Sequence, residues 1–77
     1  MTIRNHTAVT LEVLDKKLEP YESFEYAEGI YGRLDIHSDI GSCIIIIDYG
    51  QIQLKNFGRL TVKCEKGKNK TFLVIAN

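Results

Sequence analysis

The stretch GSCIIIIDYG, residues 41–50, decides the fold because it places four consecutive isoleucines between two glycines. Successive side chains of a β-strand point to opposite faces, so this stretch is apolar on both faces. One face carries Cys43, Ile45 and Ile47, and the other carries Ile44 and Ile46. One set can enter the core of a small domain, whereas the other is exposed unless something covers it. The stretch therefore predicts a central strand with a second surface that needs cover.

Two sources of cover for Ile44 and Ile46 are open. The segment of residues 18–21 can fold over the strand within the same chain. Alternatively, the two isoleucines form a self-association or partner surface, since unexplained apolar patches often mark interfaces. A homodimer is one form of this second alternative.

Alternation of apolar and polar residues continues on both sides of the central stretch. It runs through AVTLEVLD, YGRLDIHS, GQIQLKNFG and RLTVKCE, and the chain closes with the apolar TFLVIAN. Period two is the pattern of strands with one wet face, and the glycines between these runs are typical of hairpin turns. We predict an all-β fold, a small antiparallel β-sandwich or rolled sheet of six to seven short strands. The strands at 43–49 and 71–76 are expected to be central.

The length of 77 residues limits the chain to one β domain over residues 1–77. No apolar run approaches the ~18 residues of a membrane span, and the opening MTIRNHTAVT has no apolar signal segment. We therefore expect a cytoplasmic protein that does not enter a membrane. The two sequons, at Asn5 and Asn69, would matter only in a secreted chain.

An acidic and aromatic segment, LEPYESFEYAEGIYG, is ambiguous between strand and helix. Its aromatic content favours a strand, although a short helical turn near Pro20 also fits. Carboxylates and exposed rings together suit a basic groove on another protein, because they combine ion pairing with ring burial. A solvated polar edge is the ordinary alternative. The candidate partner-binding residues are Tyr21, Glu22, Phe24, Glu25, Tyr26 and Glu28.

Charge is unevenly distributed along the chain, although the formal net charge is zero. Residues 1–50 hold nine acidic and four basic residues, and residues 51–77 hold six basic residues and one acidic residue. The lysines of KCEKGKNK form a candidate anion-binding hairpin, with Lys66, Lys68 and Lys70 as its residues. We favour a solubilising role, because lysines keep edge strands unpaired and no interleaved aromatic platform accompanies them. Nucleic acid is therefore an unlikely partner.

Catalytic chemistry has little support in the sequence. Asp35, His37 and Asp39 of DIHSD fall on one face of a strand, where they can orient a catalytic base or hold a metal. Strand alternation alone also predicts this trio as a wet face, and we favour that interpretation. Cys43 and Cys64 both lie in apolar alternation, which predicts buried, unreactive thiols rather than a disulfide or a metal site. We expect no enzyme activity, no metal and no cofactor.

These observations favour a small, non-catalytic protein that binds a larger protein or protein complex and acts by occupying its surface. Inhibitors have this character, among them phage-encoded antagonists of bacterial defence, including anti-CRISPR-like proteins, and immunity proteins. Two alternatives stay open. One is an oligomeric structural β module built on Ile44 and Ile46. The other is a binder of an anionic small ligand or nucleic acid that uses the lysine hairpin.

Overall fold

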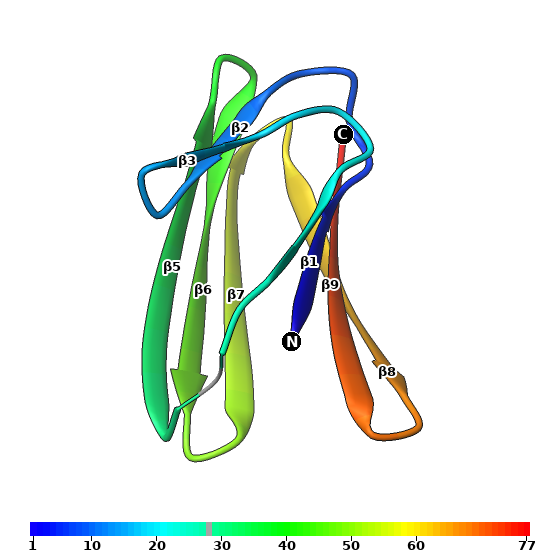
Figure 1. The fold of residues 1–77 in the computed structure, drawn as a ribbon. Coiled ribbons are helices and arrows are strands. Elements are labelled where there is room, and N and C mark those ends of the chain that lie inside the picture. Colours follow the sequence, from blue (N-terminus) through cyan, green and yellow to red (C-terminus); the bar gives the residue numbers. More distant parts are fainter. Residues whose placement is uncertain (28) are drawn as a thin grey trace.

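The computed structural model describes residues 1–27 and 29–77 and confirms the all-β class. Nine strands form two sheets (Figure 1). In spatial order, the first sheet contains β4 (Ser23–Glu25), β1 (Thr2–Asn5), β9 (Lys70–Ala76) and β8 (Thr61–Gly67). The second contains β3 (Lys16–Leu18), β2 (Leu11–Val13), β5 (Tyr31–Ser38), β6 (Gly41–Asp48) and β7 (Gln51–Gly58). All pairs are antiparallel except β1 with β9.

The structure has more strands than the six to seven expected. Short strands account for the difference, because three residues are too few for a visible alternation. The turn between β2 and β3 lies at Leu14 and Asp15, which have φ angles of 49° and 63°, and Lys16 and Lys17 belong to β3. The ambiguous acidic segment forms strand β4, and no helix occurs in the described ranges.

The core lies between the two sheets and is built from the inner faces of the long strands. In β6 the inner set of Cys43, Ile45 and Ile47 is buried, and the outer set is half-exposed. Both strands expected to be central lie inside their sheets, since β6 runs between β5 and β7, and β9 runs between β1 and β8. The other buried apolar residues are Ile3, Leu11, Val13, Leu18, Leu34, Ile36, Leu60, Val62, Leu73 and Ile75.

A buried polar side chain, Asn5, connects the two sheets. Its Nδ2 donates to the carbonyl oxygens of Val9 at 2.8 Å and Leu18 at 3.0 Å. Its Oδ1 accepts from the backbone N–H of Thr7 at 2.9 Å and from the Thr7 hydroxyl at 2.6 Å. Buried polar groups are tolerated when they are fully hydrogen-bonded in this way. Asn5 therefore fixes the chain where it crosses from β1 to β2.

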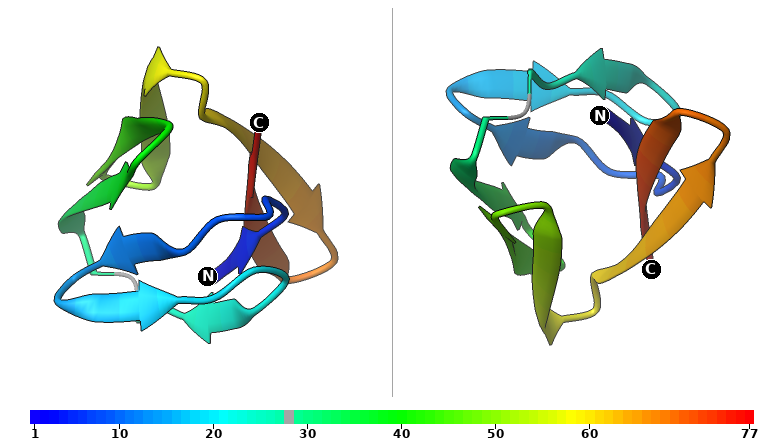
Figure 2. Two further views of the ribbon diagram at one scale, coloured as in Figure 1. Left: turned by 90° about the horizontal axis from the view of Figure 1, so that it is seen from above. Right: turned by 90° about the horizontal axis from the view of Figure 1, so that it is seen from below.

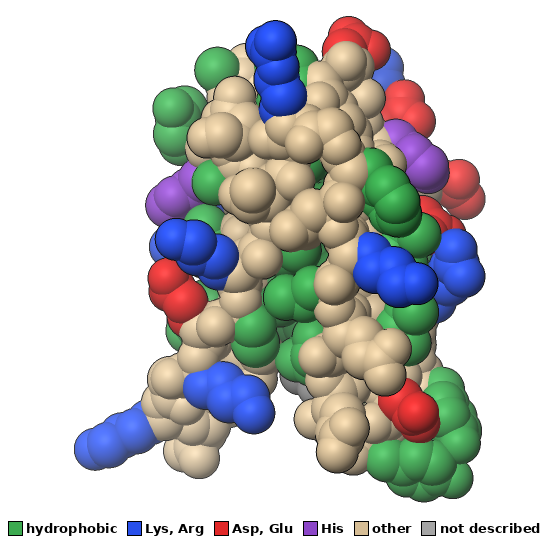
Figure 3. Space-filling model, turned by 180° about the vertical axis from the view of Figure 1, so that it is seen from behind, with side chains coloured by type: hydrophobic (Ala, Val, Ile, Leu, Met, Phe, Trp, Pro, Cys, Tyr) green, Lys and Arg blue, Asp and Glu red, His purple; other side chains and the backbone are tan. Residues whose placement is uncertain are grey.

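The molecule is closed at one end and open at the other. Seen along its long axis, the five-stranded sheet is bent, so that β2 and β3 close one side of the core and β5 to β7 another (Figure 2). At the closed end, a Cβ on Gly41 would lie 2.3 Å from the carbonyl oxygen of Phe57, so only glycine fits there. At the open end, the β6–β7 and β8–β9 hairpins form two separate arms with a hollow between them (Figure 3).

None of the described elements is a helix long and apolar enough to cross a membrane.

Candidate functional site

Exposed aromatic side chains gather at the end of the β6–β7 arm (Figure 3). We call the cluster of Ile30, Tyr31, Asp48 and Tyr49 the tyrosine tip. Three of its side chains are largely exposed: Ile30 at 61%, Tyr31 at 64% and Tyr49 at 72%. Single exposed apolar residues are ordinary, but a contiguous group at the end of an arm is typical of an interaction site.

The backbone fixes the geometry of the tyrosine tip. Tyr49 and Gly50 form the two-residue turn of the β6–β7 hairpin, with φ angles of 47° and 78°. Positive φ at both positions defines a type I′ turn, which matches the twist of the flanking strands. Tyr31, the first residue of β5, pairs with Asp48 across the strands. The backbone N–H of Tyr49 donates to the carbonyl oxygen of Ile30 at 2.9 Å, which ties the turn to the start of β5.

The two tyrosine rings support each other. Their centroids are 4.9 Å apart and their planes meet at 70°, the edge-to-face arrangement that aromatic pairs prefer. A hydrogen bond to the Tyr49 side chain, with a smaller effect of desolvation, raises the pKa of Tyr31 above 10.0. The Tyr31 hydroxyl therefore stays neutral at physiological pH, and the ring pair presents a fixed aromatic surface to solvent.

The carboxylate of Asp48 is the third component of the tip. Its Oδ1 is buried and has no hydrogen-bond partner among residues 1–27 and 29–77. The Asp48 residue as a whole is half-exposed, so the carboxylate lies at the edge of the surface. Arg33 lies two residues after Tyr31, but its Nε donates to Asp35 Oδ1 at 3.2 Å. This neighbouring cation thus pairs with another acid.

Tyrosine is an unfavourable choice for the first position of a type I′ turn. Asn, Asp and Gly dominate there because other side chains meet the backbone when φ is positive. Strained positions of this kind often occur at functional sites. This site was not predicted from the sequence, although DYGQ at the centre of a predicted hairpin places an aromatic residue where the turn favours asparagine.

The structure brings together only some of the candidate partner-binding residues of the acidic segment: Glu22, Phe24 and Glu25 line one pocket. Phe24 and Tyr26 are half-buried against the core, whereas Tyr21 is 72% exposed at the turn before β4. Glu22 Oε1 accepts from the backbone N–H of Glu19 at 2.7 Å. Glu25 accepts from the Thr2 hydroxyl and lies 3.8 Å from the N-terminal ammonium. Glu28 lies outside the described residues.

The outer face of the five-stranded sheet holds Ile44 and Ile46, both half-exposed. In register, Ile44 lies between Asp35 and Lys55, and Ile46 lies between Arg33 and Gln53. The segment of residues 18–21 does not cover them. Leu18 is buried in the core, and the N–H of Tyr21 donates to the carbonyl oxygen of Asn5 in the other sheet. The two isoleucines are therefore part of a mixed surface with charged neighbours.

The lysine hairpin forms the end of the second arm. Lys66, Lys68 and Lys70 are all exposed, and Asn69 adopts a φ of 66° in the turn between β8 and β9. Figure 3 shows basic side chains at the end of this arm and hydrophobic ones at the end of the other. The lysines and the tyrosine tip thus lie at the same end of the molecule on different arms.

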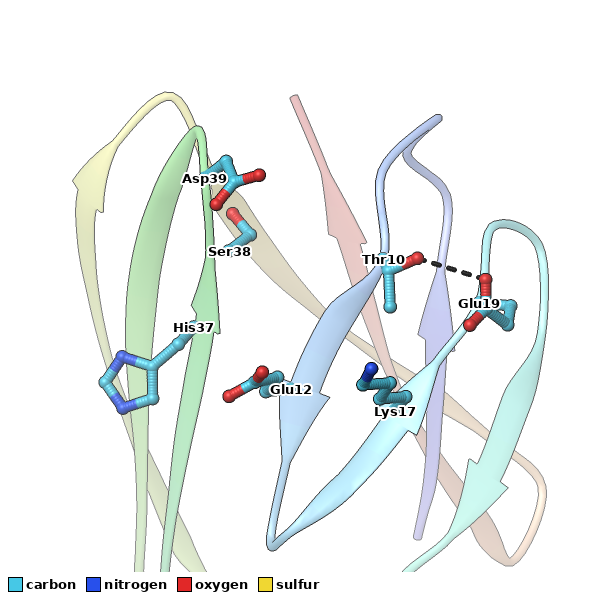
Figure 4. A pocket seen from close by; sticks show the side chains of 7 residues that line it. All are labelled: Thr10, Glu12, Lys17, Glu19, His37, Ser38 and Asp39. Atoms are coloured by element: carbon cyan, nitrogen blue, oxygen red, sulfur yellow. Dashed lines mark hydrogen bonds between the residues drawn. The ribbon is translucent and has the colours of Figure 1, made fainter.

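His37 and Asp39 line a shallow pocket of about 360 Å³. The other lining residues are Thr10, Glu12, Lys17, Glu19 and Ser38. The Thr10 hydroxyl donates to Glu19 at 3.0 Å, and the His37 ring points away from Asp39 (Figure 4). Asp35 pairs with Arg33 and does not line this pocket. In the described part of the chain, no three His, Cys, Asp or Glu side chains are placed to hold one metal ion.

The two cysteines differ, and the prediction that both are buried is wrong for Cys64. Cys43 is buried in β6, whereas Cys64 is exposed in β8, and both are free thiols. Cys64 continues the inward face of Leu60 and Val62, but the two sheets diverge toward the C-terminal end of β8 (Figure 1). The alternation correctly predicted which face of β8 Cys64 occupies. It could not show how far the core extends along the strand.

Comparisons with protein-family models, with curated proteins and with solved structures gave no match for this chain.

Proposed function

We propose that this chain is a non-catalytic protein-binding module that occupies a surface on a larger protein through its tyrosine tip. The observation that carries the proposal is Tyr49, an exposed aromatic residue at a turn position that favours asparagine. Tyr31 and Ile30 add exposed apolar area directly beside it. Tyrosine is enriched at interfaces because it buries a large ring at a low entropic cost.

The rest of the surface supports a binding role over catalysis. His37 lines two open pockets, one with Asp39 and one with Asp35, and its ring points away from Asp39 (Figure 4). A rigid hairpin that presents aromatic residues needs no catalytic group, because it acts by excluding another ligand from the surface it covers. We place the chain with inhibitor-type proteins, such as phage-encoded antagonists of bacterial defence or immunity proteins, and we expect it to act in the cytoplasm.

The first test compares two tyrosines that match in solvent exposure and in backbone conformation. Tyr21 and Tyr49 are each 72% exposed, and each has a positive φ, 65° and 47°. In both Tyr49→Asn and Tyr21→Asn, asparagine relieves the left-handed backbone, by roughly 1 kcal/mol. Thermal unfolding should therefore show both variants at least as stable as the parent chain. We expect Tyr49→Asn to lose binding of the protein partner, because the ring that contacts it is absent. Tyr21→Asn should retain that binding.

The measurement is affinity capture of the tagged chains from a nuclease-treated bacterial lysate, with quantification of each retained protein. The proposal requires a stoichiometric protein that is retained by the parent chain and by Tyr21→Asn but not by Tyr49→Asn. Loss with Tyr21→Asn alone would move the binding surface to the acidic segment. Retention by all three chains, or of nothing in any of them, contradicts a role for the tyrosine tip.

A further inference from the structure

We propose that the tyrosine tip binds an arginine side chain of its partner, with the guanidinium group on a tyrosine ring and paired with Asp48. This inference rests on the proposed function and names the chemistry that the same site recognises. It joins two observations: an exposed aromatic pair, and a carboxylate beside it with an unsatisfied oxygen.

The first feature of the site is the Asp48 carboxylate with its unsatisfied oxygen. A buried carboxylate oxygen without a donor is unfavourable, because the desolvation of the charge is not compensated. Asp48 therefore gains from any donor that reaches it. Rotation about χ2 of an aspartate is soft and exchanges its two oxygens, so a donor that approaches the exposed side can satisfy the carboxylate. A bidentate guanidinium satisfies both oxygens at once.

The described residues do not supply this donor themselves. Arg33 is on the same face of the sheet, two residues from Tyr31, yet its guanidinium pairs with Asp35. The cross-strand neighbours of Asp48 are Tyr31 and Gln51, neither of which carries a positive charge. The lysine hairpin forms a different arm. Among the described residues, the carboxylate at the tip is thus without a cationic partner.

The second feature of the site is the pair of tyrosine rings. A cation over an aromatic face is attracted by the ring quadrupole, and arginine is the more frequent partner because its planar group stacks on the ring. The edge-to-face pair of Tyr31 and Tyr49 keeps the rings in place before binding. A lysine ammonium is a compact, strongly hydrated charge that cannot pair through two parallel donors. An anionic partner is disfavoured because Asp48 would repel it.

The experiment uses the full ¹⁵N-labelled chain and two blocked peptides, acetyl-Gly-Arg-Gly-amide and its citrulline counterpart. Citrulline keeps the planar shape of arginine and removes the charge. We expect the arginine peptide to shift the amide signals of residues 30–31 and 48–50, with an affinity about threefold or more above that of the citrulline peptide. Salt should weaken the preference, because the site is exposed.

Two variants make the test specific. Asp48→Asn keeps the shape of the side chain and removes its charge, so the preference for arginine should disappear. Asp39→Asn changes an exposed carboxylate at the other end of β5 and should leave the preference unchanged. Equal binding of both peptides, a preference retained in Asp48→Asn, or shifts confined to other residues would each overturn the inference.

The outcome also separates this inference from the proposed function. If the lysate partner is retained by Asp48→Asn as well as by the parent chain, and the two peptides bind equally, the arginine site is wrong and the binding module stands. If the arginine preference is found and depends on Asp48 but no protein partner is captured, the site is real and the proposed function fails.

Discussion

Burial gives the two cysteines of the chain different chemistry. Cys43 is on the inner face of β6, where desolvation raises the pKa of its thiol to about 11. Cys64 is exposed on β8, near the open end of the molecule. Because folding raises the pKa of Cys43 from 9.0, the folded state loses stability as the pH rises through this interval. Below pH 9 the thiol is neutral in both states and this contribution is intact.

We predict that the native chain has one reactive thiol at pH 8. Only the thiolate reacts, and a group with a pKa of about 11 is about one part in a thousand thiolate at this pH. Alkylation followed by mass spectrometry should label Cys64 quickly and Cys43 at least about a hundredfold more slowly. Cys64→Ser should therefore remove the fast phase. Two fast phases in the native chain would show that Cys43 is accessible.

At the scale of elements, side-chain hydrogen bonds stabilise the short strands as much as the backbone hydrogen bonds between strands do. β1, β2 and β3 have only three or four residues each, and few ladder bonds result. Asn5 compensates, because its amide binds backbone groups at Val9 and Leu18 and its oxygen binds Thr7. This single side chain therefore substitutes for hydrogen bonds that longer strands would have made.

We predict that Asn5→Ala lowers the free energy of unfolding by about 2–4 kcal/mol, because it leaves buried backbone groups without partners. Urea denaturation followed by circular dichroism measures the change. Asn56→Ala is the control. Because Asn56 is exposed on β7, this substitution should change the free energy of unfolding by no more than about 0.5 kcal/mol. If both substitutions have the same small effect, the Asn5 network does not hold the sheets together.

At the scale of the whole molecule, the outer face of the five-stranded sheet is mixed rather than apolar. Ile44 and Ile46 are each flanked by a charged residue on β5 and a polar or charged residue on β7. Stable interfaces bury about 1,200–2,000 Å² in total and have cores depleted in charge. Two half-exposed isoleucines between polar and charged neighbours do not meet that description.

We therefore predict a monomer of 8.8 kDa whose mass does not depend on concentration. Multi-angle light scattering across a hundredfold range of concentration measures this directly. Ile44→Asp should leave the mass unchanged, because the side chain is half in solvent already. A dimer that Ile44→Asp dissociates would instead support the oligomeric β module considered from the sequence.

The periodic parts of the fold could be predicted from the sequence, and the irregular parts could not. Alternation placed the long strands and the inner face of β6 correctly, because burial on one face imposes a period of two. The strands β1 and β3 were missed because three or four residues show no clear period. Cys64 was placed in the core because alternation reports the face of a residue and not how far the two sheets stay together.

The candidate site was missed for a related reason. Tyr31 and Tyr49 are 18 positions apart and meet only because the β5–β6 register places Tyr31 opposite Asp48. A single sequence shows each tyrosine at the end of a run but does not show their pairing. The acidic segment was predicted as a binding surface because its charged and aromatic residues are contiguous in the sequence. Two of its rings, Phe24 and Tyr26, pack against the core instead.

The parallel pairing of β1 with β9 bears on the order in which the chain folds. Thr2 pairs with Phe72 and Asn5 with Ile75, so β1 cannot pair with β9 until about 70 further residues have been synthesised. Such long loops close slowly, and all-β domains dominated by distant contacts fold in milliseconds to seconds. While β9 is still inside the ribosome, β1 lacks its parallel neighbour and Ile3 remains uncovered on that side. The first sheet is therefore completed only when β9 has left the ribosome, and chaperone contact is expected to concentrate before that point.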